Sequence, residues 1–462
     1  MTAKLDIGAM GMPPTETSFL MRFAHGTLRA EESARLLHCG RAHPLRRPRP
    51  RSAFPPASGL RRALTTYVWF PQRNHRYSIA EHVLAVLYPL ILGLGRLETT
   101  EPLRHNGVFQ YLAGLPTYPA ATTLRRFLHR FGTAGLGAFS RLHDRYRRAF
   151  RHTVTPGTQA VLDFDSTVLT VYGQQEQAVI GFNPKKRGRP SYLPLLCFDG
   201  VTRDVWAGSF HPGNTHVATV TLALCEEARA KLPEAIRNVR IRGDAAFLDH
   251  KLIGWLEARG AAYVIVARLT APIKRRLSTL AYQRVSGEIA AAEFQYQPQG
   301  WPGPRRFVVI RRPVPEEPSW QLHLFQLGRF HYQAFVTNLP LTPLYLWRFY
   351  NDRSQAELII RQLKEAYALG KIPTKDFSAN LAFFHLALFA YNCLNWFKRC
   401  CAPPAFQRAT LQRLRQQLLW TPALLVRPDG HPTLRLPASY PHRVAFQDTL
   451  QRVAAFRPPW RR

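Results

Sequence analysis

The stretch Gln159–Gly173, "QAVLDFDSTVLTVYG", decides the fold class. It is rich in β-branched residues, alternates in hydrophobicity and ends at a glycine, a pattern that predicts a strand. Further strands are expected after it at 191–200, 205–213, 238–244 ("NVRIRGD") and 261–269, with helices at 217–232 and 249–259. Three early strands followed by alternating helix and strand indicate an α/β fold with a mixed sheet.

Different patterns flank this region. Ser78-Ile-Ala-Glu81 resembles a capping box and opens a helical region, in which Thr122 and Thr123 can cap a second helix. One long helix is expected over Pro343–Ala368, and further helix over 376–399. The regions expected are a flexible Arg/Pro-rich extension (1–65), a helical domain (66–155), an α/β domain (156–400) with a β-rich insertion at about 270–340, and a basic C-terminal region (401–462).

Charge narrows the class of partner. The 462 residues carry 63 Lys plus Arg against 29 Asp plus Glu, a formal charge of +34. Such an excess favours a polyanionic partner, most often nucleic acid, and argues against an acidic enzyme of small molecules. With 46 % hydrophobic residues, the chain is not a disordered basic tail. The basic excess is largest in residues 1–75 and 400–462 and smallest in 151–270, where 11 acids lie.

Cysteine usage and hydropathy bear on the compartment. None of the six cysteines has the CxxC spacing of a zinc site, and their low density argues against a disulfide framework. No signal peptide is recognised, and the apolar stretch His82–Gly95 is too short to cross a membrane. We therefore expect a cytoplasmic protein with no membrane partner.

Acids set against this basic trend are candidates for metal-dependent chemistry. Cleavage of a phosphodiester needs an activated water and neutralisation of an anionic transition state, which two divalent metals held by carboxylates provide. Asp163 and Asp165 lie two apart on a predicted strand and therefore share a face. Asp244 ends another predicted strand, and Glu357 lies in the long helix. A capping or turn role is the alternative for either acid of the Asp163–Asp165 doublet, and the apolar strand before Arg-Gly-Asp244 argues against an adhesion role.

The long helix carries a polar stripe. Tyr350, Arg353, Glu357 and Lys364 are spaced 3, 4 and 7 apart, which places them on one side of a continuous helix. A solvated, ion-paired surface is the alternative interpretation.

Basic side chains cluster in two further places. Arg125 and Arg126 lie on the polar face of a predicted amphipathic helix, where they can contact DNA phosphates. A loop in the α/β domain contains Lys185, Lys186, Arg187 and Arg189 and can follow a DNA backbone. An ordinary solvated surface is the alternative in both places.

These motifs together resemble those of bacterial insertion-sequence transposases of the DDE class, in the group with a Tyr-(2)-Arg-(3)-Glu-(6)-Lys signature. "VLDFDST", "RGDAAF" and the 350–364 residues match in order, as do "YGQQEQAVIGFNPKKRGRPSYLPLL" and "HPGNTH", over roughly residues 66–400. Residues 1 to about 63 do not resemble the start of the family.

The resemblance implies a ribonuclease H-like catalytic domain at 156–400, preceded by a DNA-binding domain. It places catalytic, metal-binding acids at Asp165, Asp244 and Glu357, with Asp163 as an assisting or alternative ligand. It also implies that Tyr350, Arg353 and Lys364 contact the cleaved DNA end. The expected cofactor is Mg²⁺, two ions, for which Mn²⁺ can substitute.

The expected function is DNA transposition by metal-dependent cleavage and strand transfer. The expected partners are double-stranded DNA (terminal inverted repeats and target) and further copies of the chain, as a homodimer or larger assembly at the bacterial nucleoid. Two alternatives remain: an inactive or repurposed DNA-binding protein, and a ribonuclease H-like nuclease.

Overall fold

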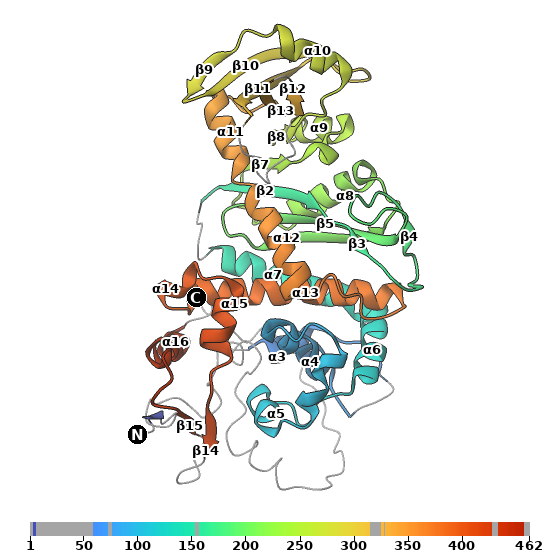
Figure 1. Cartoon of the computed structure of the whole chain (residues 1–462). Coiled ribbons are helices and arrows are strands. Elements are labelled where there is room, and N and C mark those ends of the chain that lie inside the picture. Colours follow the sequence, from blue (N-terminus) through green and yellow to red (C-terminus); the bar gives the residue numbers. More distant parts are fainter. Residues whose placement is uncertain are drawn as a thin grey trace. The chain divides into compact units, whose positions relative to one another are not determined.

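The computed structural model describes residues 3–5, 59–72, 76–152, 157–314, 325–327, 329–426 and 433–456 (Figure 1). The chain forms two compact units. Unit 1 contains residues 1–153, 173–176 and 361–462, and unit 2 contains residues 154–172 and 177–360. The predicted α/β domain reached residue 400, whereas unit 2 ends at Ile360, because the helices beyond it pack with the N-terminal helices.

Unit 2 is built on one mixed sheet. Its first strands are β2 (Gln159–Ser166), β3 (Leu169–Thr170), β4 (Val179–Ile180), β5 (Pro190–Asp199), β6 (Val205–Pro212), β7 (Asn238–Gly243) and β8 (Ala262–Val266). β5 lies antiparallel between β2 and β6, while β2, β7 and β8 run parallel to one another. The order of antiparallel strands followed by parallel ones confirms the α/β fold class with a mixed sheet.

The predicted β-rich insertion extends this same sheet. Its strands are β9 (Gln283–Ser286), β10 (Ile289–Tyr296), β11 (Arg305–Pro313), β12 (Phe325–Leu327) and β13 (Phe330–Thr337). β13 pairs antiparallel with β8, and the sheet continues through β11 and β10 to β9. The segment also starts with a helix, α10 (Ala271–Thr279), which the strand-like pattern did not predict.

Helices cover this sheet and supply its core. They are α8 (Val217–Ala230), the 3₁₀ turn η3 (Ala245–Phe247), α9 (His250–Glu257) and α11 (Pro343–Asn351). The fully buried Trp206 of β6 donates its indole N–H to the Ala228 carbonyl at 2.9 Å, which attaches α8 to the sheet. Leu162 and Phe164 of β2 are buried in the same core, so the strand that carries the acid doublet is rigidly held.

The single helix predicted over Pro343–Ala368 is wrong, because the structure has two helices there. α11 ends at Asn351 and α12 (Ser354–Ala366) begins three residues later. In a continuous helix the Phe349 carbonyl would accept the N–H of Arg353. Here that carbonyl accepts Arg242 Nη1 at 2.5 Å, and the Arg353 N–H turns to the Tyr350 carbonyl at 2.9 Å. The tertiary hydrogen bond from Arg242 therefore interrupts the helical ladder.

Unit 1 is mostly helical. Its first helices are α3 (Leu60–Tyr67), α4 (Ile79–Leu92), η1 (Glu98–Arg104), α5 (Gly107–Ala113), α6 (Ala121–Arg130), η2 (Phe131–Gly135) and α7 (Leu136–His152). The capping box of Ser78 and Glu81 is confirmed at the start of α4. The predicted cap by Thr122 or Thr123 is wrong: α6 begins after Ala120 with no side-chain cap, and both threonines lie inside its first turn.

The central helix of unit 1 is α13 (Phe377–Cys400). It is long and apolar enough to cross a membrane, but 78 % of its most apolar 18-residue window is buried in the protein. Aromatic residues of α7 pack on it, with the rings of Phe150 and Trp396 stacked at 4.5 Å. Such burial is typical of a core helix in a protein of this size.

The remaining elements of unit 1 lie in the two end regions of the chain, for which no helix or strand was predicted. They are α14 (Pro404–Gln407), α15 (Leu411–Leu414), η4 (Arg415–Leu419), β14 (Leu424–Val426), β15 (Thr433–Leu436), α16 (Arg443–Ala455) and β1 (Ala3–Leu5), which pairs with β15. Most of the predicted Arg/Pro-rich extension lies outside the described residues. Its last residues belong to α3, in which Leu60 and Leu64 are buried.

Candidate active site

The acid doublet lies at the end of β2 in the interior of unit 2. Asp163 is 2 % exposed and Asp165 is 7 % exposed. The parallel register pairs Phe164 with Gly243, so the next residues, Asp165 and Asp244, lie at neighbouring strand ends. The chain order of strand and acid therefore brings two carboxylates from distant parts of the sequence to one edge of the sheet.

Asp244 and Glu357 both lie at the start of a helical element, η3 for Asp244 and α12 for Glu357. Asp244 caps η3, and its Oδ1 accepts the Ala246 N–H at 2.9 Å. This bond holds Oδ1 of Asp244 in place, whereas Oδ2 is not part of the cap. Glu357 lies in the first turn of α12, with its side chain 70 % exposed. A negative charge is favoured at that position by the helix dipole.

Arg353 connects the three acids. Its Nη2 lies 3.2 Å from Asp165 Oδ1 and 3.9 Å from Asp244 Oδ2, and its Nη1 lies 3.7 Å from Glu357 Oε1. Its Nε donates to the Phe164 carbonyl at 3.2 Å, and the residue is only 4 % exposed. Three carboxylates from a strand, a strand end and a helix thus converge on one buried guanidinium.

The charges in this cluster are strongly coupled. Burial raises the pKa of Asp165 to about 6; Arg353 opposes this rise, and the negative charges of Asp244 and Glu357 add to it. Burial alone would lower the pKa of Arg353, but the nearby acids outweigh burial and raise it. Three acids against one cation leave the cluster under-neutralised, which favours the binding of a further cation.

Asp163 has a separate partner. Its two carboxylate oxygens accept Nε and Nη2 of Arg242 at 2.5 and 2.7 Å, and both side chains are almost completely buried. Burial raises the pKa of Asp163, and the contact with Arg242 opposes that shift. Arg242 also lies 3.9 Å from Asp352. The pair therefore joins the sheet to the corner between α11 and α12.

Arg242 is the residue of this site that the sequence interpretation missed. Its signal was present: it is a cation in the apolar strand "VRIRGD", two residues before Asp244. A charge at such a position is rarely fully buried unless it is paired. Asp163, in the neighbouring strand, is the partner that this rule requires.

The polar stripe predicted on one helix is divided by the helix break. Tyr350 lies in the last turn of α11, Arg353 lies in the break, and Glu357 and Lys364 lie on α12. Tyr350 is 8 % exposed, its ring packs against Phe335 at 4.8 Å, and burial raises its pKa to about 12. As folded here, this ring is too buried to stack on a base. The contacts predicted for Tyr350, Arg353 and Lys364 with a DNA end stay predictions.

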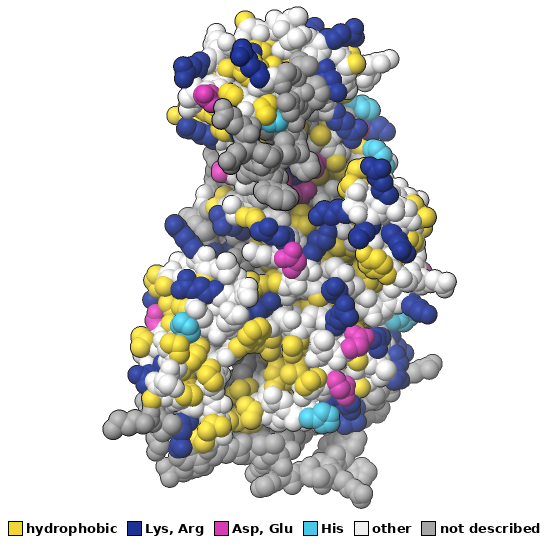
Figure 2. Space-filling view, viewed as in Figure 1, with side chains coloured by type: hydrophobic (Ala, Val, Ile, Leu, Met, Phe, Trp, Pro, Cys, Tyr) yellow, Lys and Arg dark blue, Asp and Glu magenta, His cyan; other side chains and the backbone are white. Residues whose placement is uncertain are grey.

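The basic loop is presented outward on unit 2. It connects β4 to β5 and carries four exposed cations: Lys185, Lys186, Arg187 and Arg189. Asn183 anchors the loop, since its Nδ2 donates to Thr170 Oγ1 at 2.9 Å and its Oδ1 accepts the Lys186 N–H at 3.1 Å. The visible face in Figure 2 carries Lys and Arg side chains in many places and fewer acids.

The acids suit a divalent cation in their chemistry. Carboxylate oxygens are the ligands that Mg²⁺ and Mn²⁺ prefer, and here three carboxylates already surround one cationic group. In the described residues, however, no three His, Cys, Asp or Glu side chains are close enough together to hold one ion as they stand. The donor set therefore fits a metal, with the Arg353 guanidinium lying between the donors.

Comparison with known proteins gives a family match over most of the chain. Residues 56–458 match the family model described as "Transposase DDE domain group 1". A solved piggyBac transposase, in a synaptic complex with hairpin DNA, is 10 % identical with a TM-score of 0.42, over 75 % of this chain and 72 % of that chain. Among curated protein sequences, none matches this chain.

Proposed function

The chain belongs to the transposase DDE domain group 1 family and is a DDE transposase, an enzyme of DNA transposition; on this premise we propose that it is the transposase of a bacterial insertion sequence. It would bind the terminal inverted repeats of its element, cleave DNA at their ends and join the freed 3′ end to target DNA. The signature spacing of Tyr350, Arg353, Glu357 and Lys364 supports this narrower assignment.

The catalytic fold that we propose is ribonuclease H-like. The support is topological: the antiparallel strands β2, β5 and β6 are followed by β7 and β8, which run parallel to β2. The first two acids of the cluster lie at the adjacent ends of β2 and β7, and the third comes from a later helix. This order matches the order in which the motifs occur in the sequence.

The convergence of Asp165, Asp244 and Glu357 on Arg353 is the observation that carries the catalytic assignment. These three acids would hold the divalent metals, for which we propose Mg²⁺. When bound, such ions supply an activated water and neutralise charge on the phosphate. Asp165 and Asp244 are fixed by the sheet and by η3, so they define the position of the reacting phosphate, while the exposed Glu357 can adjust.

Asp163 is not a metal ligand in this proposal. Both of its oxygens are occupied by Arg242, and removing that contact would leave a buried guanidinium with only the exposed Asp352, at 3.9 Å, as its ion-pair partner. Its role is to hold Arg242, which in turn holds the Phe349 carbonyl at the corner before Arg353 and Glu357. The doublet thus divides into one structural and one catalytic acid.

The DNA would be held outside the acid cluster by exposed cations. We propose that Lys185, Lys186, Arg187 and Arg189 contact its backbone. We further propose that the chain works as a dimer or larger assembly at the bacterial nucleoid in the cytoplasm, because a transposase must hold two element ends at once.

The test compares two glutamates on α12. Glu357→Gln should reduce metal-dependent nicking of a labelled element end more than about 100-fold, because loss even of groups that only support metal ligands costs 10–100-fold. Glu365→Gln, two turns later and exposed, is the matched control and should cleave normally. Both variants should bind the end as the parent does.

Each alternative function gives a different result in this test. Cleavage by Glu357→Gln at the parental rate would overturn the catalytic assignment. A parent protein that binds but never nicks with Mg²⁺ or Mn²⁺ would be an inactive or repurposed DNA-binding protein. Nicking without joining of the 3′ end to a target plasmid would identify a nuclease instead of a transposase.

A further inference from the structure

Unit 1 contains a pocket of its own. Its volume is about 670 Å³, a size typical of ligand-binding pockets. The lining comes from α6, from the turn that leads into α13, and from residues of α4 and the segment after α3. The charged and ionisable residues among them are Arg125, Arg126, His129, Arg130, Lys375 and Asp376, together with the buried His82.

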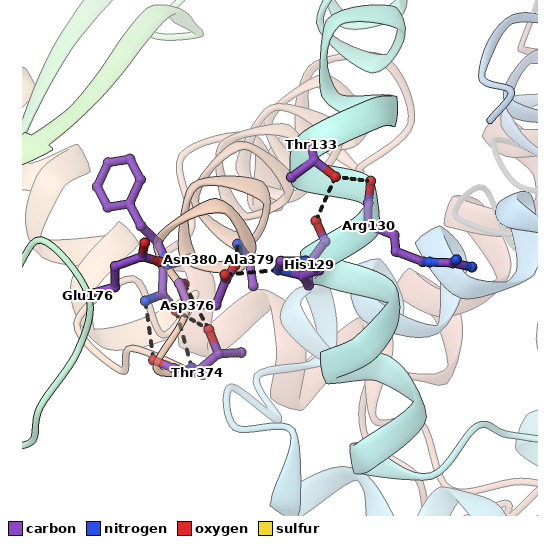
Figure 3. A network of polar contacts seen from close by, with 9 residues as sticks. His129, Arg130, Thr133, Glu176, Thr374, Asp376, Ala379 and Asn380 are labelled. Carbon is purple, nitrogen blue, oxygen red and sulfur yellow. Dashed lines mark hydrogen bonds and ion pairs between the residues drawn. The ribbon is translucent and has the colours of Figure 1, made fainter. Parts of the chain in front are cut away.

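The pocket is strongly basic, and the one acid among its described lining residues is already engaged. Asp376 Oδ2 contacts His129 Nδ1 at 2.8 Å, and its Oδ1 accepts the Ala379 N–H at 2.6 Å as the cap of α13. Figure 3 shows His129 on α6 turned toward Asp376. Asp376 is therefore not available to neutralise the cations around it.

The cations differ in what they are free to bind. Arg125, predicted from sequence as a DNA contact, pairs with Glu98 and donates to the Pro373 carbonyl. Within the described part of the chain, Arg126, Arg130 and Lys375 have no ion-pair partner. Arg126 and Lys375 are exposed, and Arg130 is half-buried. Three uncompensated positive charges thus surround one cavity.

The turn that carries Lys375 is held rigidly. The Thr374 N–H and hydroxyl both donate to Asn380 Oδ1, at 3.2 and 2.9 Å. Glu176 donates its N–H to the Lys375 carbonyl at 2.8 Å and accepts the Phe377 N–H at 2.9 Å. Figure 3 shows the bonds between Thr374 and Asn380 at the start of α13. Lys375 therefore projects from a backbone that needs little ordering when a ligand binds.

Close packing fixes the other wall against this turn. A Cβ placed on Gly132, just after α6, would lie 2.1 Å from the Ser378 carbonyl oxygen, so only glycine allows this approach. The end of α6 and the start of α13 are thus in direct contact, and the spacing of Arg126 and Arg130 from Lys375 is built into unit 1. The floor is aromatic, with the His82 and Phe127 rings stacked at 4.5 Å.

We propose that this pocket is a DNA-binding site that takes the phosphates of a DNA strand through Arg126, Arg130 and Lys375. This inference rests on the proposed function in one respect, namely that the polyanion bound by the pocket is DNA. Arginine and lysine recognise phosphate oxygens by charge-assisted hydrogen bonds. The site lies wholly within unit 1, and none of its residues belongs to the acid cluster.

The test is the salt dependence of DNA binding. Each phosphate contact contributes about 0.9 to the slope of log K against log salt for duplex DNA. Arg126→Gln/Arg130→Gln/Lys375→Gln should lower that slope by roughly 3 in fluorescence anisotropy with a labelled duplex. The control, Arg141→Gln/Arg148→Gln/Arg408→Gln, removes three exposed charges of unit 1 outside the pocket and should lower it by less than about 1.

Folding and ligand identity are checked in the same protein. Lys375→Gln alone changes an exposed side chain and should lower the slope by about 1 with an unchanged melting temperature. Equal decreases of the slope in the two triple variants would overturn the proposed site and would show that DNA binding depends only on the overall positive charge of unit 1. A mononucleotide that competes as well as a strand of equal phosphate concentration would overturn the DNA assignment. None of these results depends on nicking, so the catalytic proposal is tested separately by Glu357→Gln.

Discussion

Replacement of each member of the acid doublet by asparagine should have opposite consequences. Asp163→Asn neutralises a carboxylate whose two oxygens both accept hydrogen bonds from the buried Arg242. Asp165→Asn instead removes one of the three negative charges around Arg353. We expect Asp163→Asn to lower stability and leave cleavage by the folded fraction, and Asp165→Asn to abolish cleavage and leave the fold.

The expected magnitudes follow from burial. The side chains of Asp163 and Arg242 are 3 % and 2 % exposed, so the loss of one partner leaves a charge that solvent cannot stabilise. Breaking such a buried pair costs about 3–5 kcal/mol of unfolding free energy. Asp165→Asn should cost less than this, because burial already disfavours the Asp165 charge and Arg353 keeps Asp244 and Glu357 nearby.

The assay combines urea unfolding with metal-dependent nicking of a labelled element end. Asp163→Leu/Arg242→Met removes both charges and should recover more than half of the stability lost in Asp163→Asn, because replacing a whole buried pair by apolar groups is often nearly neutral. Nicking should be compared at temperatures where every variant is at least about 90 % folded, which separates positioning from unfolding.

Two results would refute this division of roles. A change of less than about 1 kcal/mol in Asp163→Asn would mean that the pair with Arg242 does not stabilise unit 2. Retained nicking by Asp165→Asn together with loss in a well-folded Asp163→Asn would exchange the two acids and make Asp163 the metal ligand.

Three further results are expected. Burial raises the pKa of Asp165 from 3.8 to about 6, so its contribution to stability is full below pH 4 and is lost as the pH rises through 6. In urea unfolding without metal, the wild type should therefore lose up to about 3 kcal/mol of stability relative to Asp165→Asn between pH 4 and 7. A stability difference that does not change with pH would contradict this. A chain starting at residue 68 lacks the buried Leu60 and Leu64 of α3 and should be about 3–6 kcal/mol less stable than one starting at residue 56; equal melting temperatures of these two chains would show that α3 is dispensable. Gly132→Ala should lower the free energy of unfolding by about 1–3 kcal/mol, because its Cβ would clash with the Ser378 carbonyl. The control is Gly137→Ala in α7, whose Cβ would lie 3.7 Å from Arg141 Nη1, and this change should be neutral or stabilising. Similar melting temperatures for the two variants would mean that α6 and α13 do not meet as closely as described.

Local patterns were sufficient for most elements of the fold. β-Branched alternation located β2, β7 and β8, and the Ser78–Glu81 box located the start of α4. Strand pairing was not available from such patterns. Nothing in the 270–340 segment indicates that β13 pairs with β8 and continues the same sheet, because that depends on contacts between residues about 70 positions apart. α10 was missed for a related reason, since its short apolar pattern is compatible with a strand.

The N-terminal cap of α6 shows a second limit. Thr122 and Thr123 are good capping residues, but the helix starts at Ala121, two residues after the buried Tyr118 and Pro119, and Ala120 stands at its N-cap without a side-chain hydrogen bond. The capping propensities therefore predicted that a helix forms here but placed its N-terminus at the wrong residue. Boundaries depend on which backbone groups find tertiary partners, and sequence alone does not contain those partners.

The polar stripe was the most informative signal in the sequence, and its geometry was the least predictable. Periodicity assumes an unbroken ladder, and the hydrogen bond from Arg242 to the Phe349 carbonyl breaks it. The break allows Arg353 to leave the helix surface and enter the interior, where it reaches Asp165, Asp244 and Glu357. A strongly basic chain thereby stabilises the buried Asp165 with one of its own cations, since an unpaired buried carboxylate would be neutralised by protonation instead. Any divalent ion that binds these carboxylates must therefore offset the interactions of Arg353 as well as its own dehydration, so metal affinity and the position of the α11–α12 corner are energetically linked.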